Sequence, residues 1–145
     1  MADQTTSSIG ISASPAQVMT VIADFASYPT WATGVKEAEV IAVADDGRAD
    51  RVRFVLDASP IKDEYTLAYT WDDDRSVTWT LVSGRVLTGL DGAYVLAAGR
   101  DDTEVTYRLS VDVAIPMIGL LKRKAEKVII DAALNGLKNR VESLG

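Results

Sequence analysis

Hydrophobic and polar residues alternate along most of the chain, with a period of two that begins near Val35. Alternation of this kind is typical of antiparallel strands that bury one face and expose the other. The turn sequences DDGR, DDDR and GRDD divide the alternating region into successive strands. The segment TTSSIGIS near the start predicts one further strand. We therefore expect an antiparallel meander of about seven strands, with one apolar face and one wet face.

Helical patterns stand on both sides of this region. At residues 14–17 the sequence SPAQ forms a capping box, with Ser at the N-cap, Pro at the first helical position and Gln three residues after the cap. The apolar residues that follow at helical spacing are Val18, Ile22 and Phe25. Residues 15–24 are therefore predicted to form a helix. Pro29 stops its continuation and leaves a short second helical turn around residues 29–32.

A long helix is predicted at the C-terminal end, from about Pro116 to Ser143. Its apolar residues form two stripes on nearly opposite sides. The first stripe consists of Met117, Leu121, Ala125, Val128 and Ala132, and the second of Ile130, Leu134, Leu137, Val141 and Leu144. Two such stripes indicate either a bend near the middle of the helix or two surfaces to cover, one of them the sheet and the other a cavity mouth or a partner.

The composition indicates a single domain spanning residues 1–145, because 145 residues with 48% hydrophobic content suffice for one core and not for two. The formal net charge of −6 argues against nucleic acid, which needs a basic surface. No segment approaches the ~20 apolar residues of a membrane-spanning helix. The opening MADQTTSS lacks the basic start and apolar run of a secretory signal. We therefore expect a cytoplasmic protein.

The sequence contains no histidine and no cysteine. Ser-His-Asp and Cys-His nucleophile schemes are therefore excluded, as are metal sites built from imidazole or thiolate. The chain also has no glycine pattern of the P-loop or dinucleotide-binding type. We predict no metal site and no cofactor, and we assign no catalytic residue. Catalysis would have to use Tyr, Asp, Glu, Lys or Arg side chains.

Charged residues cluster in three short segments, WDDDR, GRDD and IKDEY. The first two fall at predicted hairpin turns, where Asp favours local backbone hydrogen bonds, and we expect them to be solvated. In the third, Lys62, Asp63 and Glu64 begin a strand. We expect an exposed charge cluster there rather than a general acid–base site. Arg85 is interpreted as a surface residue, with a position at a pocket rim as the alternative.

Aromatic residues gather on the predicted inner face of the strands: Tyr65, Tyr69, Trp71, Trp79, Tyr94 and Tyr107. Rings that bury ~150–250 Å² each dominate ordinary cores, so simple core filling is one explanation. Several buried hydroxyls that need partners favour the other, a pocket for a small molecule. In ADFASYPTWATGV, residues 23–35, we interpret Phe25 as a core plug. We interpret Trp31 as the lip of the pocket, facing IPMIGLL at residues 115–121.

The order of the motifs SPAQVMTVIADFASYPTW, DGAYVL, TEVTYRLSVDV and AALNGLKNRVE resembles the START/birch-pollen-allergen-like superfamily. Within it, the chain is similar to the polyketide cyclase/dehydrase and coenzyme-Q-binding group. The resemblance implies an α+β helix-grip fold, in which two short helices follow the first strand and the sheet curls around the long C-terminal helix. It also implies an elongated apolar cavity that binds a lipid, a polyketide, an isoprenoid-like compound or another hydrophobic small molecule.

The resemblance also implies polar handles that this chain lacks. Aromatase/cyclase members orient polyketides with a tyrosine after the YPxW-like turn and with arginines on middle strands. Aligned by hand, these positions fall on Val35, Trp71 and Leu81. This replacement favours a ligand-binding protein over a cyclase.

We therefore predict a domain that binds a hydrophobic small molecule between its sheet and its C-terminal helix. Two alternatives stay open: a cyclase/dehydratase-type enzyme, and an interaction module or homodimer that uses the C-terminal helix. The candidate ligand-binding residues are Trp31, Val35, Phe54, Tyr65, Tyr69, Trp71, Trp79, Tyr94, Tyr107, Met117 and Leu121.

Overall fold

The structure, a computed structural model, describes residues 4–32, 34–58, 61–114 and 119–144. Its elements follow one another as predicted: a strand, short helices, a run of strands and a long helix. In chain order they are β1 (Thr5–Ile11), α1 (Pro15–Ala23), the 3₁₀ turn η1 (Phe25–Ser27), α2 (Tyr28–Trp31), β2 (Val35–Val43), β3 (Ala49–Ala58), β4 (Ile61–Asp72), β5 (Ser76–Gly84), β6 (Leu87–Ala98), β7 (Thr103–Val113) and α3 (Gly119–Leu144).

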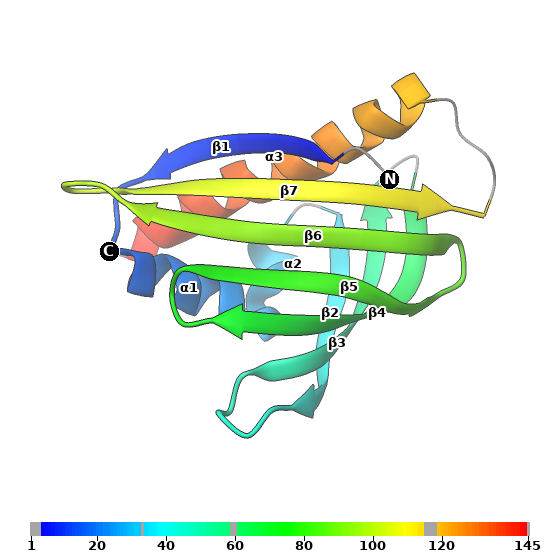
Figure 1. The fold of residues 1–145 in the computed structure, drawn as a ribbon, viewed down its shortest axis with the longest axis horizontal. Coiled ribbons are helices and arrows are strands. Elements are labelled where there is room, and N and C mark those ends of the chain that lie inside the picture. Colours follow the sequence, from blue (N-terminus) through cyan, green and yellow to red (C-terminus); the bar gives the residue numbers. More distant parts are fainter. Residues whose placement is uncertain (1–3, 33, 59–60, 115–118, 145) are drawn as a thin grey trace.

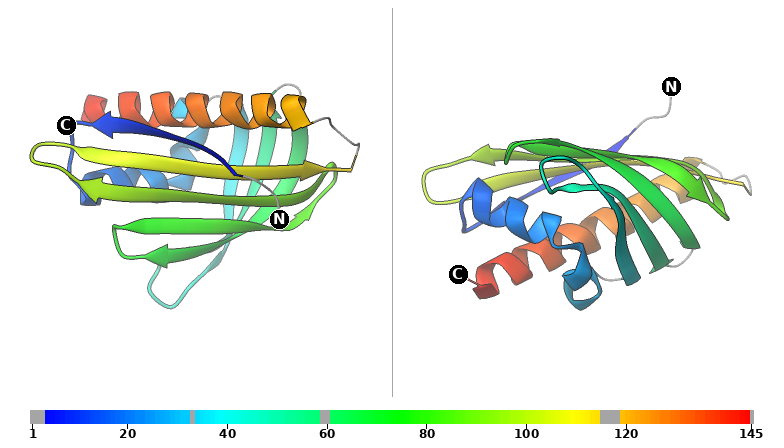
Figure 2. Two further views of the ribbon diagram at one scale, coloured as in Figure 1. Left: turned by 45° about the horizontal axis from the view of Figure 1, so that its top comes forward. Right: turned by 90° about the horizontal axis from the view of Figure 1, so that it is seen from below.

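All seven strands belong to one antiparallel sheet in the order β1-β7-β6-β5-β4-β3-β2. Strands β2 to β7 form a meander, and β1 joins the far edge by pairing with β7, with Thr5 opposite Leu109. The sheet is strongly curled, and the helices lie on one side of it (Figures 1 and 2). Helix α3 packs against β1 and β7. The α+β helix-grip fold, with two short helices after the first strand, is thereby confirmed.

The first helix begins as its sequence predicts. The Ser14 hydroxyl accepts a hydrogen bond from the Gln17 amide at 3.2 Å, and the Gln17 side chain accepts one from the Ser14 amide at 2.9 Å. This reciprocal capping box satisfies two amides that the first helical turn leaves without partners. Farther along, Phe25 is 1% exposed and packs against the Tyr69 ring, with 4.9 Å between ring centroids. Phe25 is therefore the core plug that was expected.

Helix α3 buries the second of its two predicted stripes. The buried members of that stripe are Ile130, Leu134, Leu137 and Val141, each at most 3% exposed. The first stripe does not form a surface of its own: Ala125 is buried, Ala132 is half-buried and Val128 is 49% exposed. The expectation of two separate apolar surfaces on this helix is therefore wrong for the described residues.

A buried carboxylate joins α3 to the sheet. Glu126 is fully buried and accepts hydrogen bonds at 2.7 Å from the Thr5 hydroxyl, the Val111 amide and the Lys122 ammonium group. Each carboxylate oxygen therefore has a donor, as a buried charge requires. This contact attaches the helix to β1 and β7, the two strands that lie beside it.

Candidate functional site

The inner face of the curled sheet, together with α2 and α3, lines a cavity of about 80 Å³. Every strand from β2 to β7 contributes at least one side chain to its wall, and α3 contributes two. The lining residues are Tyr28, Trp31, Ala32, Val35, Phe54, Leu56, Tyr65, Leu67, Tyr69, Trp79, Leu90, Tyr94, Tyr107, Leu109, Ile129 and Ala133. None of them carries a charged side chain.

Aromatic rings in contact with one another form one wall of the cavity. Trp79 lies 5.3 Å from Tyr94 and 5.5 Å from Tyr107, measured between ring centroids. Tyr94 and Tyr107 are 4.7 Å apart and nearly perpendicular, and Tyr69 reaches Trp79 at 5.7 Å. Edge-to-face and tilted pairs at these distances are favourable arrangements of aromatic rings. The network holds the rings in place on β4, β5, β6 and β7.

The tyrosine hydroxyls give this apolar wall its polar atoms. Tyr28 donates its hydroxyl proton to the backbone oxygen of Ile22, and no hydrogen bond joins the hydroxyls of the other four lining tyrosines to described residues. Burial raises the pKa of Tyr65 and of Tyr107 far above the ordinary value of a phenol. Burial and the neighbouring tyrosines do the same to the pKa of Tyr69. The hydroxyls are therefore neutral and can both donate and accept hydrogen bonds.

Trp31 adds a donor with no partner. The residue is 8% exposed, and its Nε1 atom is buried without a hydrogen-bond acceptor among the described residues. Its Cε3 edge lies against Gly136 of α3. Trp71 differs, because its Nε1 donates to the Ala49 carbonyl at 2.7 Å.

The structure gathers most of the predicted ligand-binding residues around this cavity. The lining includes Trp31, Val35, Phe54, Tyr65, Tyr69, Trp79, Tyr94 and Tyr107. Trp71 is outside the lining: it packs beside Phe25 at the edge of the core and lies 5.1 Å beneath the Arg48 guanidinium group. Met117 lies outside the described residues, and nothing is described of the Leu121 side chain. That Trp31 faces residues 115–121 therefore stays a prediction.

Sequence reasoning missed half of the lining: Tyr28, Ala32, Leu56, Leu67, Leu90, Leu109, Ile129 and Ala133. Leu56 and Leu67 share strand faces with the predicted Phe54 and Tyr65, so the alternation itself could have identified them. Ile129 and Ala133 are four residues apart on α3 and lie beside its buried stripe, where the apolar pattern gave no separate signal.

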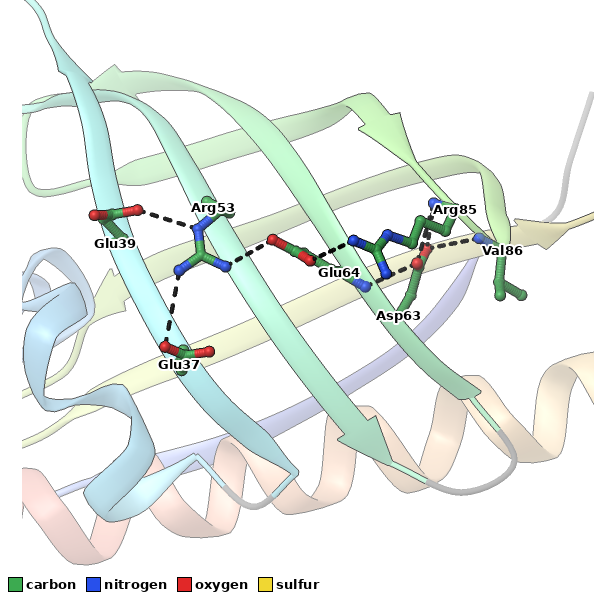
Figure 3. Close-up of polar contacts among 7 residues, drawn as sticks. All are labelled: Glu37, Glu39, Arg53, Asp63, Glu64, Arg85 and Val86. Carbon is green, nitrogen blue, oxygen red and sulfur yellow. Dashed lines mark hydrogen bonds and ion pairs between the residues drawn. The ribbon is translucent and has the colours of Figure 1, made fainter.

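The outer face of the sheet carries a chain of ion pairs (Figure 3). Arg53 of β3 contacts Glu39 at 3.1 Å and Glu37 at 3.8 Å on one side, and Glu64 of β4 at 2.8 Å on the other. Glu64 also contacts Arg85 at 3.0 Å. Arg85 is therefore a surface residue of the outer face, as we interpreted it, and it does not line the cavity.

Asp63 corrects the expectation of an exposed charge cluster in IKDEY. It is 8% exposed, and its carboxylate accepts hydrogen bonds from the backbone amides of Arg85 and Val86 at 3.0–3.2 Å (Figure 3) and from that of Leu87 at 2.9 Å. Arg85 and Val86 form the connection between β5 and β6, and Leu87 is the first residue of β6. Asp63 can be buried because its carboxylate accepts the hydrogen bonds that water would otherwise accept from these amides.

In the part of the chain that the structure describes, no group of three or more Asp or Glu side chains is arranged to hold a metal ion. None of the helices there has the length and apolar character needed to cross a bilayer.

The sheet, the helices and the cavity together define a protein with the helix-grip fold. Residues 2–142 match the family model described as polyketide cyclase / dehydrase and lipid transport. The chain therefore belongs to that family. Comparison with curated protein sequences gives no match.

Solved structures share the fold at low sequence identity. A START superfamily protein from Mycobacterium smegmatis has a TM-score of 0.91 at 22% identity, covering 98% of this chain and 99% of that one. A protein from Thermus thermophilus has a TM-score of 0.83 at 24% identity, covering 99% of both chains. The Zhui aromatase/cyclase from a Streptomyces species has a TM-score of 0.76 at 13% identity, covering 98% of this chain and 94% of that one. Identities this low show similarity of fold.

Proposed function

We propose that the protein binds a hydrophobic small molecule in the cavity between its sheet and α3. The observation that carries the proposal is the lining: sixteen side chains, none of them charged, with tyrosine hydroxyls as the main polar atoms. Small-molecule sites are typically apolar and aromatic, with a few polar groups that orient the ligand. Membership of a family described by polyketide chemistry and lipid transport supports this function.

The size of the cavity sets a condition on binding. At about 80 Å³ it is smaller than the engineered cavity of ~150 Å³ that binds benzene in another protein. A lipid, polyketide or isoprenoid-like ligand would therefore need side chains of the wall to move when it enters. Burial of ~200 Å² of apolar ligand surface at ~25 cal/mol per Å² would contribute about 5 kcal/mol, before the cost of association.

The alternative functions have less support from the geometry. Tyrosines are the only titratable side chains in the lining, so a cyclase/dehydratase would have to act by positioning and by phenol hydrogen bonds. An interaction module would need a free apolar stripe on α3, whereas Leu137 and its neighbours in that stripe are buried within the chain. A homodimer would have to use another surface.

The test is release of ligand followed by rebinding. Protein purified under native conditions is denatured and extracted, and the extract is analysed by mass spectrometry for a stoichiometric apolar compound. The emptied protein is then titrated with a panel of lipids and polyketides, with tryptophan fluorescence as the readout. Absence of a released compound together with a flat fluorescence response across the panel would overturn the proposal.

A pair of alanine variants connects binding to this cavity. Ala133 lines the cavity, whereas the adjacent Ala132 lies on the surface groove beside Asn135. Ala133→Leu should fill part of the cavity and weaken binding by about tenfold or more, the equivalent of ~1.4 kcal/mol. Ala132→Leu adds the same volume outside the cavity and should leave the affinity unchanged. Equal affinities of the two variants would place the ligand elsewhere.

A further inference from the structure

The indole N–H of Trp31 is a polar group whose role the fold does not explain. The side chain is 92% buried, and Nε1 has no acceptor among the described residues. A buried donor left without an acceptor costs roughly 1–3 kcal/mol, so structures rarely retain one. The other indole at the edge of the core, that of Trp71, has an acceptor in the Ala49 carbonyl.

Trp31 borders both the cavity and α3. The Cε3 atom is on the edge of the ring that lies nearest Gly136 of α3. Nε1 is on the opposite long edge of the indole, away from this contact. Tyr28, which also lines the cavity, lies 4.8 Å from Trp31 between ring centroids. Its hydroxyl proton is donated to Ile22.

The rest of the lining restricts the ligand further. No lining residue is charged, so a carboxylate or an ammonium group would enter without a counter-charge. Burial of an unpaired charge is far more costly than burial of a neutral polar group. Tyr65, Tyr69, Tyr94 and Tyr107 offer hydroxyls that serve a neutral oxygen as donors or as acceptors.

We propose that Trp31 is a specificity-determining residue, whose Nε1–H donates a hydrogen bond to an oxygen of an uncharged ligand in the cavity. The preferred ligands are then ketones, quinones, phenols and similar neutral oxygen compounds rather than pure hydrocarbons or carboxylates. The inference rests on the proposed function, because it needs a ligand in this cavity.

Three single-ring probes of similar shape test it: acetophenone, isopropylbenzene and benzoate. Acetophenone offers a carbonyl acceptor, isopropylbenzene replaces it with a methyl group, and benzoate adds a charge. Calorimetric titration of the full chain should show acetophenone binding roughly five- to tenfold more tightly than isopropylbenzene, as one neutral hydrogen bond predicts. Benzoate should bind more weakly than both.

Substitution then assigns that preference to one atom. Trp31→Phe keeps an aromatic ring and removes the N–H, so the preference for acetophenone over isopropylbenzene should disappear. Trp71→Phe removes an indole whose N–H is already bonded to Ala49 and which is outside the lining. It should keep the wild-type preference. The ratio of the two affinities is the readout, because a change in cavity size affects both probes alike.

A spectroscopic measurement on the wild-type protein tests the same hydrogen bond and does not require the Trp31→Phe variant to fold. The chain has three tryptophans, whose indole N–H signals are separate in a ¹H–¹⁵N spectrum. One signal other than that of Trp71 should move downfield with acetophenone and stay in place with isopropylbenzene. A preference that survives Trp31→Phe, or three indole signals that respond alike to both probes, overturns the role of Trp31. Failure of every probe to bind the wild-type chain overturns the proposed function, and the inference with it.

Discussion

Gly136 of α3 lies so close to Trp31 that a Cβ atom at position 136 would come within 2.1 Å of the Trp31 backbone oxygen. Glycine is therefore required there for the approach of two backbones and not for an unusual conformation. The contact lets the end of α2 pack directly on α3 and positions the Trp31 ring beside the cavity. The packing of two elements about one hundred residues apart thus requires a residue without a Cβ atom at position 136.

Gly136→Ala should destabilise the protein by about 1–3 kcal/mol, since overpacking forces the two backbones apart. In an exposed helix position the same change would stabilise by about 1 kcal/mol through helix propensity. Urea unfolding of the variant gives the sign directly. Asn139→Ala, at an exposed position of the same helix, is the control and should leave stability equal or slightly higher. A Gly136→Ala chain more stable than wild type would contradict the close approach.

Glu126→Gln should lower the free energy of unfolding by about 1–3 kcal/mol, because it places an NH₂ group among donors that now meet a carboxylate. Glu142 provides a matched control. It pairs with Lys138 at 2.7 Å and four residues apart, as Glu126 pairs with Lys122, but near the surface. Glu142→Gln should cost much less, since exposed ion pairs contribute little. Equal losses in urea unfolding would show that burial does not distinguish the two pairs.

Asp63→Asn should loosen the connection between β5 and β6. The amide group of Asn offers one acceptor oxygen where the carboxylate now receives amides from Arg85, Val86 and Leu87. We expect a loss of about 1–3 kcal/mol in stability. Hydrogen exchange of those three amides should speed up more than that of the rest of the sheet. The exposed Asp91→Asn on β6 should change neither quantity.

Alkaline pH should unfold the protein cooperatively, because all five tyrosines of the chain are buried and their pKa values are raised, chiefly by burial. In the unfolded chain each titrates with a pKa of about 10. The native state holds these protons more tightly, so its stability is fully present below pH ~10 and falls as the pH rises above that value.

The measurement is a spectrophotometric titration of tyrosinate followed together with circular dichroism. Ultraviolet absorbance of tyrosinate should appear in the same pH interval as the loss of secondary structure. A tyrosine could instead titrate at the ordinary pKa of about 10 while the circular dichroism stays native. Its hydroxyl would then be accessible to solvent. The titration would thus contradict the burial of that tyrosine.

The sequence pattern predicts which side of the sheet a residue faces better than it predicts how far along the strand the cavity extends. Tyr65, Tyr69 and Trp71 alternate correctly to the inner face, yet Trp71 is at the end of β4, beyond the cavity, with its N–H bonded to β3. The aromatic character that identified the other rings carries no information about this position. Depth along a strand depends on the curl of the sheet and on where α2 and α3 cover it.

Asp63 shows the opposite case: the alternation along β4 predicts its position correctly, whereas its charge suggested the wrong one. Asp63 has the same parity as Tyr65 along β4, and alternation therefore directs it inward. Its charge suggested solvent exposure, because the amides of the β5–β6 connection that replace water come from another part of the chain. In α3 the pattern was ambiguous for another reason: two apolar stripes satisfied the same periodicity, and packing against β1 and β7 selected one.

The pairing of β1 with β7 imposes an order on folding. Strand β1 is synthesised about one hundred residues before its partner in the sheet, with Thr5 beside Leu109. We expect the β2–β7 meander to close hairpin by hairpin during synthesis, and β1 and α3 to be added afterwards, since Glu126 joins α3 to β1 and β7. Contacts so distant in sequence slow folding. Co-translational folding should thus proceed from the β2–β7 meander outward, and the sheet should acquire β1 only after β7 has emerged.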